Sequence, residues 1–328
     1  MPRELDEDDV RIRPGRGSRP RTRTRPAHED AGGAVVVTVD RGRYRLRADD
    51  GRLLTAVRAR ELGRRAVVVG DRVAVVGDRS GGPDALGRIV RIEPRTSLLR
   101  RTPDDNDPVE RAVVANAEVL VVVTSLADPP PRPRLVDRCL VAAYDGGLVP
   151  VLCLTKSDLA DPAELRGLYE PLGVAAVVTG PGPRDEGVSE LLARLTGRTS
   201  VLFGQSGVGK STLVNRLVPD AGRAVGEVTG VGRGRHTSSS AVALPLPDGG
   251  TVIDTPGVRS FGLGAVTAER VLAAFPDLVD GAARCPPGCT HLPGEPGCAL
   301  DDWVRQGHAS VARLDSLRRL LLALAAQD

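Results

Sequence analysis

Only two of the 45 basic residues in this 328-residue chain are lysines, Lys156 and Lys210, and each lies in a short motif that could bind part of a nucleotide. A compact ammonium group fits a tight phosphate cradle better than the broad, planar guanidinium of arginine. A sequence that uses arginine almost everywhere else therefore indicates a chemical reason for lysine at these two positions.

The segment around Lys210 has the G-x-x-x-x-G-K-[ST] pattern of a phosphate-binding loop, between an expected strand at residues 200–203 and an expected helix at 210–218. Its glycines let backbone N–H groups turn inward around phosphate oxygens, and the following helix N-terminus adds positive potential. Lys210 is expected to reach the β- and γ-phosphates, and the Ser211 hydroxyl to coordinate Mg²⁺. The expected phosphate-binding residues are Gly204, Gln205, Ser206, Gly207, Val208, Gly209, Lys210, Ser211 and Thr212.

A second phosphate-side motif, Asp254-Thr255-Pro256-Gly257, follows an expected strand at residues 251–253. A carboxylate at a strand end is placed to hold Mg²⁺ through water, and the Gly257 N–H can then meet the γ-phosphate. Alone, the motif would indicate an ordinary turn. Its position after a phosphate-binding loop favours a magnesium and γ-phosphate switch.

Between these two motifs lies a glycine- and serine-rich segment, residues 232–240, which carries His236. Its glycines predict mobility, and its hydroxyl groups offer a second ligand for Mg²⁺. Thr237 is the first choice for that ligand and Ser238 the second, and the sequence does not separate them.

Lys156 belongs to a Thr-Lys-Ser-Asp motif that follows an expected strand at residues 149–154. In the N/T-K-x-D motif of GTPases the aspartate accepts hydrogen bonds from N1 and N2 of guanine, which adenine cannot supply, and the lysine stem lies along the base. The expected base-binding residues are Thr155, Lys156, Ser157 and Asp158. We therefore expect GTP as the substrate, with a further backbone contact to the base at Thr179-Gly180.

The order of the motifs is reversed relative to an ordinary GTPase, in which the base motif follows the phosphate motifs. Here the base motif comes first, and no second N/T-K-x-D occurs after Gly257. When the termini of a fold are adjacent, they can be joined and new termini opened elsewhere while the site is kept. This rearrangement is a circular permutation. The switch after Asp254 then runs directly into the C-terminal part of the chain, which γ-phosphate contacts could reorient.

Three of the five cysteines cluster near the C-terminus with a histidine, in the pattern C-x3-C-x-H-x6-C. Three thiolates and one imidazole form a closed tetrahedral set for structural Zn²⁺. The expected ligands are Cys285, Cys289, His291 and Cys298. Cys139 and Cys153 lie in expected core elements, and we interpret them as inert.

The elements that must position these motifs predict a multi-domain α/β protein. Short strand-like runs indicate a small N-terminal β-barrel, with an OB-fold as the simplest candidate and a small sandwich or SH3-like barrel as alternatives. These runs are residues 35–39, 44–47, 66–69, 72–76 and 88–92. Strands and helices then alternate, which is typical of an open α/β sheet covered by helices. The expected strands are 119–123, 149–154, 175–178, 200–203, 241–246 and 251–253, and the expected helices are 135–143, 163–169, 188–195, 210–218 and 311–326.

Four parts follow from this pattern. They are a disordered Arg-rich tail at residues 1–32, an OB-fold domain at 33–104, to which the resemblance described below assigns RNA binding, a permuted GTPase domain at 105–266 and a helical zinc-binding domain at 267–328. Residues 31–100 hold fifteen arginines against eight acids, which indicates a polyanionic partner. An aromatic content of 2% argues against nucleic-acid binding through stacked aromatic rings.

The remaining composition predicts a cytoplasmic protein, and we expect a monomer, although the composition does not determine the oligomeric state. No run of 18 apolar residues exists that could span a membrane, and the N-terminus is too polar for a secretory signal. The clustered cysteines fit metal binding in a reducing compartment better than a disulfide framework.

Together these motifs resemble the circularly permuted, small-ribosomal-subunit-dependent GTPases of bacteria, over roughly residues 33–328. The resemblance implies GTP hydrolysis stimulated by the small ribosomal subunit during late maturation of that subunit. It also implies an OB-fold that contacts ribosomal RNA, and a zinc domain. The chain departs from the family pattern at Thr155, where asparagine is usual, so affinity for the base could differ modestly.

The resemblance also implies a role for His236. Val258 occupies the position at which many GTPases carry the glutamine that orients the attacking water, and valine cannot form that hydrogen bond. The resemblance points to His236 instead, and its alternative roles are RNA binding or local packing. Gly207 stands where potassium-stimulated relatives carry asparagine, so we predict no potassium dependence from this loop.

Two rival functions remain open from the sequence. One is a GTP-gated RNA-binding module in which hydrolysis is incidental. The other is a P-loop kinase or ATPase, which the Thr-Lys-Ser-Asp motif argues against.

Overall fold

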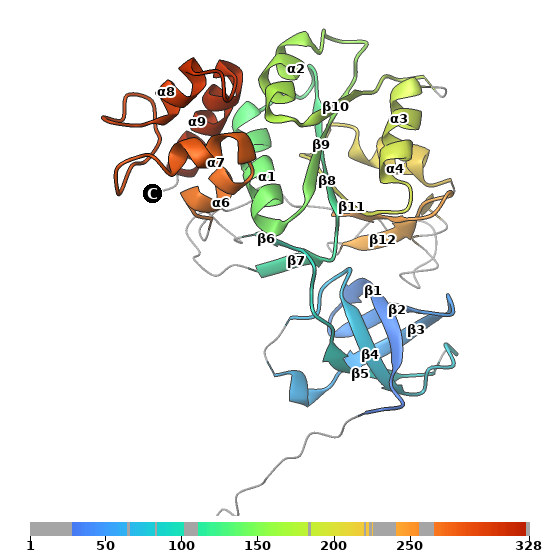
Figure 1. The fold of residues 1–328 in the computed structure, drawn as a ribbon. Helices are drawn as coiled ribbons and strands as arrows, with labels where there is room; N and C mark the ends of the chain where they lie inside the picture. The colour runs from blue at the N-terminus through green and yellow to red at the C-terminus, as the bar shows by residue number, and fades with distance from the viewer. Residues whose placement is uncertain are drawn as a thin grey trace, which may run out of the picture. The chain divides into compact units, whose positions relative to one another are not determined.

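The computed structural model describes residues 28–63, 66–82, 84–101, 111–182, 185–219, 221–222, 225, 241–255 and 266–325. The described part of the chain contains a five-stranded β-barrel, a central α/β sheet and a group of C-terminal helices (Figure 1). No helix within these ranges is both long and apolar enough to span a membrane.

The barrel is closed by pairing of its first and fourth strands. Its strands are β1 (Gly32–Asp40), β2 (Arg43–Ala48), β3 (Leu53–Arg58), β4 (Arg72–Gly77) and β5 (Gly87–Ile92). Their order is β1-β2-β3-β5-β4, with β4 returning to β1, and the β3–β5 pair is parallel while the others are antiparallel. Alternate residues such as Tyr44, Leu46, Leu54 and Ala56 fill the interior. The predicted barrel is confirmed.

One predicted barrel strand is wrong. Residues 66–69 form only an isolated bridge, from Val69 to Val114, and the third strand is Leu53–Arg58 instead. The apolar run ends in a turn because the Asp71 carboxylate accepts a hydrogen bond from Val68 N at 2.8 Å. Residues 53–58 alternate in burial, which is the pattern of a strand with one buried face.

The central sheet has the strand order β10-β9-β8-β11-β13-β12, and every neighbouring pair is parallel except β12–β13. Its strands are β8 (Val119–Ser125), β9 (Val149–Thr155), β10 (Ala175–Val178), β11 (Thr199–Phe203), β12 (Val242–Pro245) and β13 (Thr251–Asp254). Its helices are α1 (Pro133–Gly146), α2 (Ala163–Tyr169), α3 (Glu186–Leu195) and α4 (Lys210–Leu217). Each of these ten elements was predicted from the sequence, with ends that agree within three residues.

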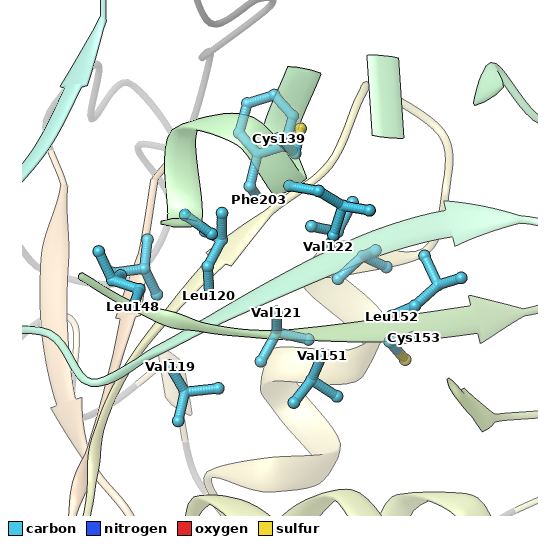
Figure 2. Close-up of a cluster of buried hydrophobic side chains, with 14 of the residues drawn as sticks. Val119, Leu120, Val121, Val122, Cys139, Leu148, Val151, Leu152, Cys153 and Phe203 are labelled. Carbon is cyan, nitrogen blue, oxygen red and sulfur yellow. The ribbon is translucent and has the colours of Figure 1, made fainter. Parts of the chain in front are cut away.

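Strands β8 and β9 lie in the middle of the hydrophobic core (Figure 2). Every residue of β8 is buried, as expected for a parallel strand covered on both faces. Cys139 and Cys153 are fully buried in the same core. Burial raises the pKa of the Cys153 thiol to about 12 and raises the pKa of Cys139 as well, so both thiols stay protonated and poorly reactive.

Two strands were not predicted from the sequence. Strands β6 (Leu98–Arg101) and β7 (Arg111–Ala115) form a separate antiparallel sheet that precedes β8. The C-terminal helices are α6 (Ala268–Ala273), α7 (Pro276–Ala282), α8 (Leu300–Arg305) and α9 (Val311–Ala325).

Two arginines of helix α9 make contacts to other helices, Arg319 to the central sheet's α1 and α2 and Arg313 to α7. Arg319 donates to Asp137 Oδ1 of α1 at 3.2 Å and to the Leu168 carbonyl of α2 at 3.0 Å, and its guanidinium lies over the Tyr169 ring. Arg313 forms a two-point ion pair with Asp277 of α7, at 3.0 and 2.8 Å. Arg319 therefore joins α9 to α1 and α2, and Arg313 joins α9 to α7.

Candidate nucleotide site and metal centre

Four parallel strands bring the predicted motifs to one edge of the central sheet. Ser125 at the end of β8 pairs with Thr155 at the end of β9, Val122 pairs with Phe203 at the end of β11, and Leu202 pairs with Asp254. The carboxyl ends of parallel strands are where α/β sheets bind ligands. The base motif, the phosphate-binding loop and Asp254 therefore meet although they are distant in the sequence.

The loop between β11 and α4 has a backbone that requires glycine. Gly207 and Gly209 have φ angles of 84° and 92°, which side chains rarely tolerate. A Cβ atom on Gly204 would lie 2.6 Å from the carbonyl oxygen of Val123. Val208 is fully buried and anchors the loop to the core. Helix α4 begins at Lys210, and Ser211 and Thr212 in its first turn are exposed.

Lys210 and Asp254 form an ion pair at this edge. The Lys210 side chain is 11% exposed and the Asp254 side chain 26%. The ammonium expected at the phosphates and the carboxylate expected near Mg²⁺ therefore lie side by side. Thr255 Oγ1 donates to Leu202 O at 2.7 Å, which fixes the end of β13 against β11.

The base motif is tied directly to the phosphate-binding loop. Thr155 Oγ1 lies 2.6 Å from the carbonyl oxygen of Val208 and 3.2 Å from that of Thr124. Threonine at this position therefore still supplies a donor that links the two motifs. Lys156 has a φ of 60°, and its ammonium donates to the carbonyl oxygen of Asp128. Asp158 is exposed at the sheet edge.

The sequence did not point to the loop that receives Lys156. Asp128 O also accepts a hydrogen bond from Ser125 Oγ at 2.9 Å, and the Pro129 ring lies 3.5 Å from a Cβ built on Gly207. The loop after β8 thus lies between the two motifs. It acts through a backbone oxygen, and a backbone oxygen leaves no signal in residue type.

The expected second contact to the base lies beside the base motif. Thr179 is buried, its N–H donates to Leu154 O at 2.7 Å, and its carbonyl accepts from Ser157 N at 3.2 Å. A Cβ on Gly180 would lie 2.9 Å from Ser157 Oγ.

Several predicted residues fall in parts of the chain that the structure does not describe. They are His236, Thr237, Ser238, Gly257 and Val258. Their roles stay predictions from the sequence.

The four predicted metal ligands come together. Their ligand atoms all lie within 4.8 Å of one another. The thiols of Cys285, Cys289 and Cys298 lie 3.5, 3.5 and 3.9 Å from His291 Nδ1. Tetrahedral zinc with ordinary bond lengths would separate sulfur and nitrogen ligands by about 3.6 Å. The spacing therefore suits a tetrahedral metal ion.

The surroundings of the cluster suit metal binding as well. The backbone N–H of Ala299 donates to Cys285 Sγ at 3.2 Å, which stabilises a thiolate. Burial lowers the pKa of His291, which favours the neutral ring that a metal requires. Arg318 holds the cluster in place through His291 O at 3.3 Å and a two-point ion pair with Asp301.

The family model and the curated relatives that match this chain carry the same family name. The family model described as RsgA GTPase matches residues 92–264. The Small ribosomal subunit biogenesis GTPase RsgA of Chromohalobacter salexigens is 40% identical over 245 residues, which cover 73% of this chain and 71% of that protein. The protein of the same name from Pseudomonas putida is 39% identical over 251 residues, covering 74% and 72%.

Two solved structures share the fold. YjeQ from Thermotoga maritima is 25% identical with a TM-score of 0.66, covering 90% of this chain and 99% of that one. YloQ, described as a circularly permuted GTPase, is 22% identical with a TM-score of 0.65, covering 93% and 99%.

Proposed function

The chain belongs to the RsgA GTPase family, and we propose that it is a small-ribosomal-subunit biogenesis GTPase whose turnover is stimulated by that subunit late in its maturation. The observation that carries this proposal is the meeting of a guanine-type motif, a phosphate-binding loop and Asp254 at one sheet edge. A kinase or ATPase would not need the Thr-Lys-Ser-Asp motif at that edge.

At the phosphate end, Lys210 binds the β- and γ-phosphates, and the Ser211 hydroxyl and the Asp254 carboxylate supply the hard oxygen donors that Mg²⁺ prefers. Bound Mg²⁺ would neutralise charge that develops on the phosphates. The Lys210–Asp254 ion pair supports this assignment, because it places the cation and the carboxylate around one point. The sequence adds Thr237 as the second hydroxyl ligand and the Gly257 N–H as a donor to the γ-phosphate.

At the base end, Asp158 accepts hydrogen bonds from guanine N1 and N2 while Lys156 lies along the ring. The hydrogen bond from Thr155 to the Val208 carbonyl supports a shared site, since it fixes the distance between base motif and phosphate loop. Thr179-Gly180 supplies the backbone contact on the far side of the motif.

Water positioning is assigned to His236 because the family resemblance points to this histidine and Val258 cannot orient water. Hydrolysis is then slow in the free protein and fast on the small subunit, because the subunit orders residues 232–240. The barrel contributes ribosomal RNA binding, and its exposed arginines, including Arg41, Arg43, Arg60 and Arg88, support a polyanionic partner.

The cluster of Cys285, Cys289, His291 and Cys298 holds one structural Zn²⁺. Three thiolates and an imidazole are a closed set that leaves no open position for catalysis. Zinc at this site would stabilise the fold of the C-terminal helices.

GTP turnover measured with purified small subunits, with large subunits and with no ribosome tests the proposal. We expect at least about tenfold stimulation by small subunits alone, because an ordered switch is worth orders of magnitude in GTPases. Equal turnover in all three conditions would favour the alternative, a GTP-gated RNA-binding module with incidental hydrolysis.

A further inference from the structure

The loop that follows β10 is held by an arginine that belongs to no nucleotide-binding motif. Arg216 lies in the last turn of α4, and its guanidinium donates to Gly180 O at 2.8 Å and to Gly182 O. It also lies 3.3 Å from Asp185 Oδ2. The Arg216 side chain is 20% exposed, so this is a partly buried contact rather than a solvated ion pair.

Asp185 binds the same loop from the other side. We call the paired contacts of Arg216 and Asp185 to Gly180 the bracket. Its Oδ2 accepts from Gly180 N at 2.6 Å, and its Oδ1 accepts from Gly187 N at 2.9 Å as the N-cap of α3. Both backbone polar groups of Gly180 are therefore bound by charged side chains. Charge-assisted hydrogen bonds of this kind are stronger and more directional than neutral ones.

The bracketed loop lies against the base motif. Thr179 O accepts from Ser157 N at 3.2 Å, and a Cβ on Gly180 would approach Ser157 Oγ to 2.9 Å. The position of Gly180 is thus set by Arg216 and Asp185 on one side and by the base motif on the other.

Helix α4 connects this bracket to the phosphate end of the site. The helix begins at Lys210, and at 1.5 Å per residue Arg216 lies about 9 Å further along its axis. One short helix therefore starts at the phosphate-binding loop and ends at the loop beside the base.

We infer that Arg216, oriented by Asp185, is a positioning residue that fixes residues 179–182 against the guanine-reading motif and thereby raises affinity for guanine nucleotides. This inference rests on the proposed base site at Thr155–Asp158. The base is common to GDP and GTP, so the effect falls equally on both. It changes binding and leaves the chemical step unchanged.

The test compares Arg216→Ala and Arg216→Lys with a matched control, Arg194→Ala. Arg194 is an exposed arginine on the adjacent helix α3, where it pairs with Glu190 and does not contact the loop. Isothermal titration with GDP and with non-hydrolysable GTP reports Kd and the fraction of active sites separately. We expect Arg216→Ala to raise Kd about tenfold for both nucleotides, in line with the loss of charged hydrogen bonds.

Arg216→Lys should give an intermediate Kd, because an ammonium lacks the fork that reaches both carbonyls. At saturating GTP with small subunits, kcat should stay within about twofold of wild type while KM rises, the pattern of a lost uniform binding contribution. A variant that was only less stable would bind with a reduced active fraction and an unchanged Kd, and that result would overturn the inference. So would an unchanged Kd with full active fraction, an equal rise in Arg194→Ala, or a fall in kcat without a rise in KM.

The GTP affinity of Asp158→Asn tests the proposed base site independently of Arg216. If that variant kept full GTP affinity, the proposed function would lose its base site whatever Arg216 does. If Asp158→Asn lost GTP affinity while both Arg216 variants bound normally, only the present inference would fail.

Discussion

At the scale of single residues, the two lysines have different surroundings. Lys210 is nearly buried and paired with Asp254 beside the phosphate-binding loop. Lys156 adopts a left-handed backbone conformation and holds the loop after β8 through the Asp128 carbonyl. The sequence identified both lysines by their rarity. It could not identify Arg216 or Asp128, because their contacts involve backbone oxygens, which any residue supplies.

These surroundings predict different consequences for one and the same substitution. Lys210→Arg should abolish hydrolysis, with kcat reduced on the order of 100-fold or more, because a wider guanidinium displaces the phosphates from the cradle. Lys156→Arg should leave kcat near wild type and raise the Kd for GTP about fivefold, because only the contact beside the base is lost. Single-turnover hydrolysis and nucleotide titration measure the two effects. Mild and equal effects from both variants would contradict the assignment.

At the scale of elements, alternation and motif position predicted most of the sheet. The ten strands and helices of the central sheet agree with prediction because the strands are short, mostly buried apolar runs and the helices between them are amphipathic. The failure at residues 66–69 has a local cause, since the Asp71 carboxylate turns a buried apolar run away from strand pairing. The β6–β7 sheet was not predicted because neither segment, LLRR at 98–101 or RAVVA at 111–115, alternates between apolar and polar residues.

The junction between α7 and α9 offers a test of stability. Arg313 pairs with Asp277, lies 4.7 Å from the Phe275 ring centroid and reaches Pro171 O at 3.4 Å. Arg313→Ala should lower the free energy of unfolding by about 1–2 kcal/mol, since a partly buried arginine loses packing as well as charge.

The only tryptophan of the chain reports on this junction, because Trp303 Nε1 donates to Asp277 O at 2.8 Å. Urea unfolding followed by its fluorescence gives the measurement. Arg305→Ala removes an exposed ion pair with Asp302 and is the control, expected to change stability by less than about 0.5 kcal/mol. Equal losses from the two variants would contradict this account of the junction.

The metal cluster carries a separate prediction. The purified protein should hold one Zn²⁺ per chain, and Cys298→Ser should hold well under half of that, because a closed site needs all four ligands. Mass spectrometry measures the zinc content per chain of the wild type and of Cys298→Ser. Cys153→Ala is the control and should keep its zinc, since Cys153 lies in the core of the central sheet. Full zinc content in Cys298→Ser would remove that residue from the ligand set.

At the scale of the whole molecule, the order of strands in space differs from their order in the chain. The strand that carries the phosphate-binding loop, β11, lies between β8 and β13, and the base-motif strand β9 precedes it in sequence. The site is therefore assembled by the fold from motifs in permuted order. The sequence predicted this assembly because each motif directly follows a strand, and parallel strands end at one edge.

The proposed reading of guanine by Asp158, in a GTPase that the small subunit stimulates, is tested most directly by changing that residue. Asp158→Asn replaces an acceptor by an amide that can donate to the 2-oxo group of xanthine, so the nucleotide preference should invert. With purified small subunits, wild type should turn over GTP and Asp158→Asn should turn over XTP, each preferred on the order of 100-fold. Stimulated GTP turnover that persisted in Asp158→Asn, with no gain for XTP, would contradict the account.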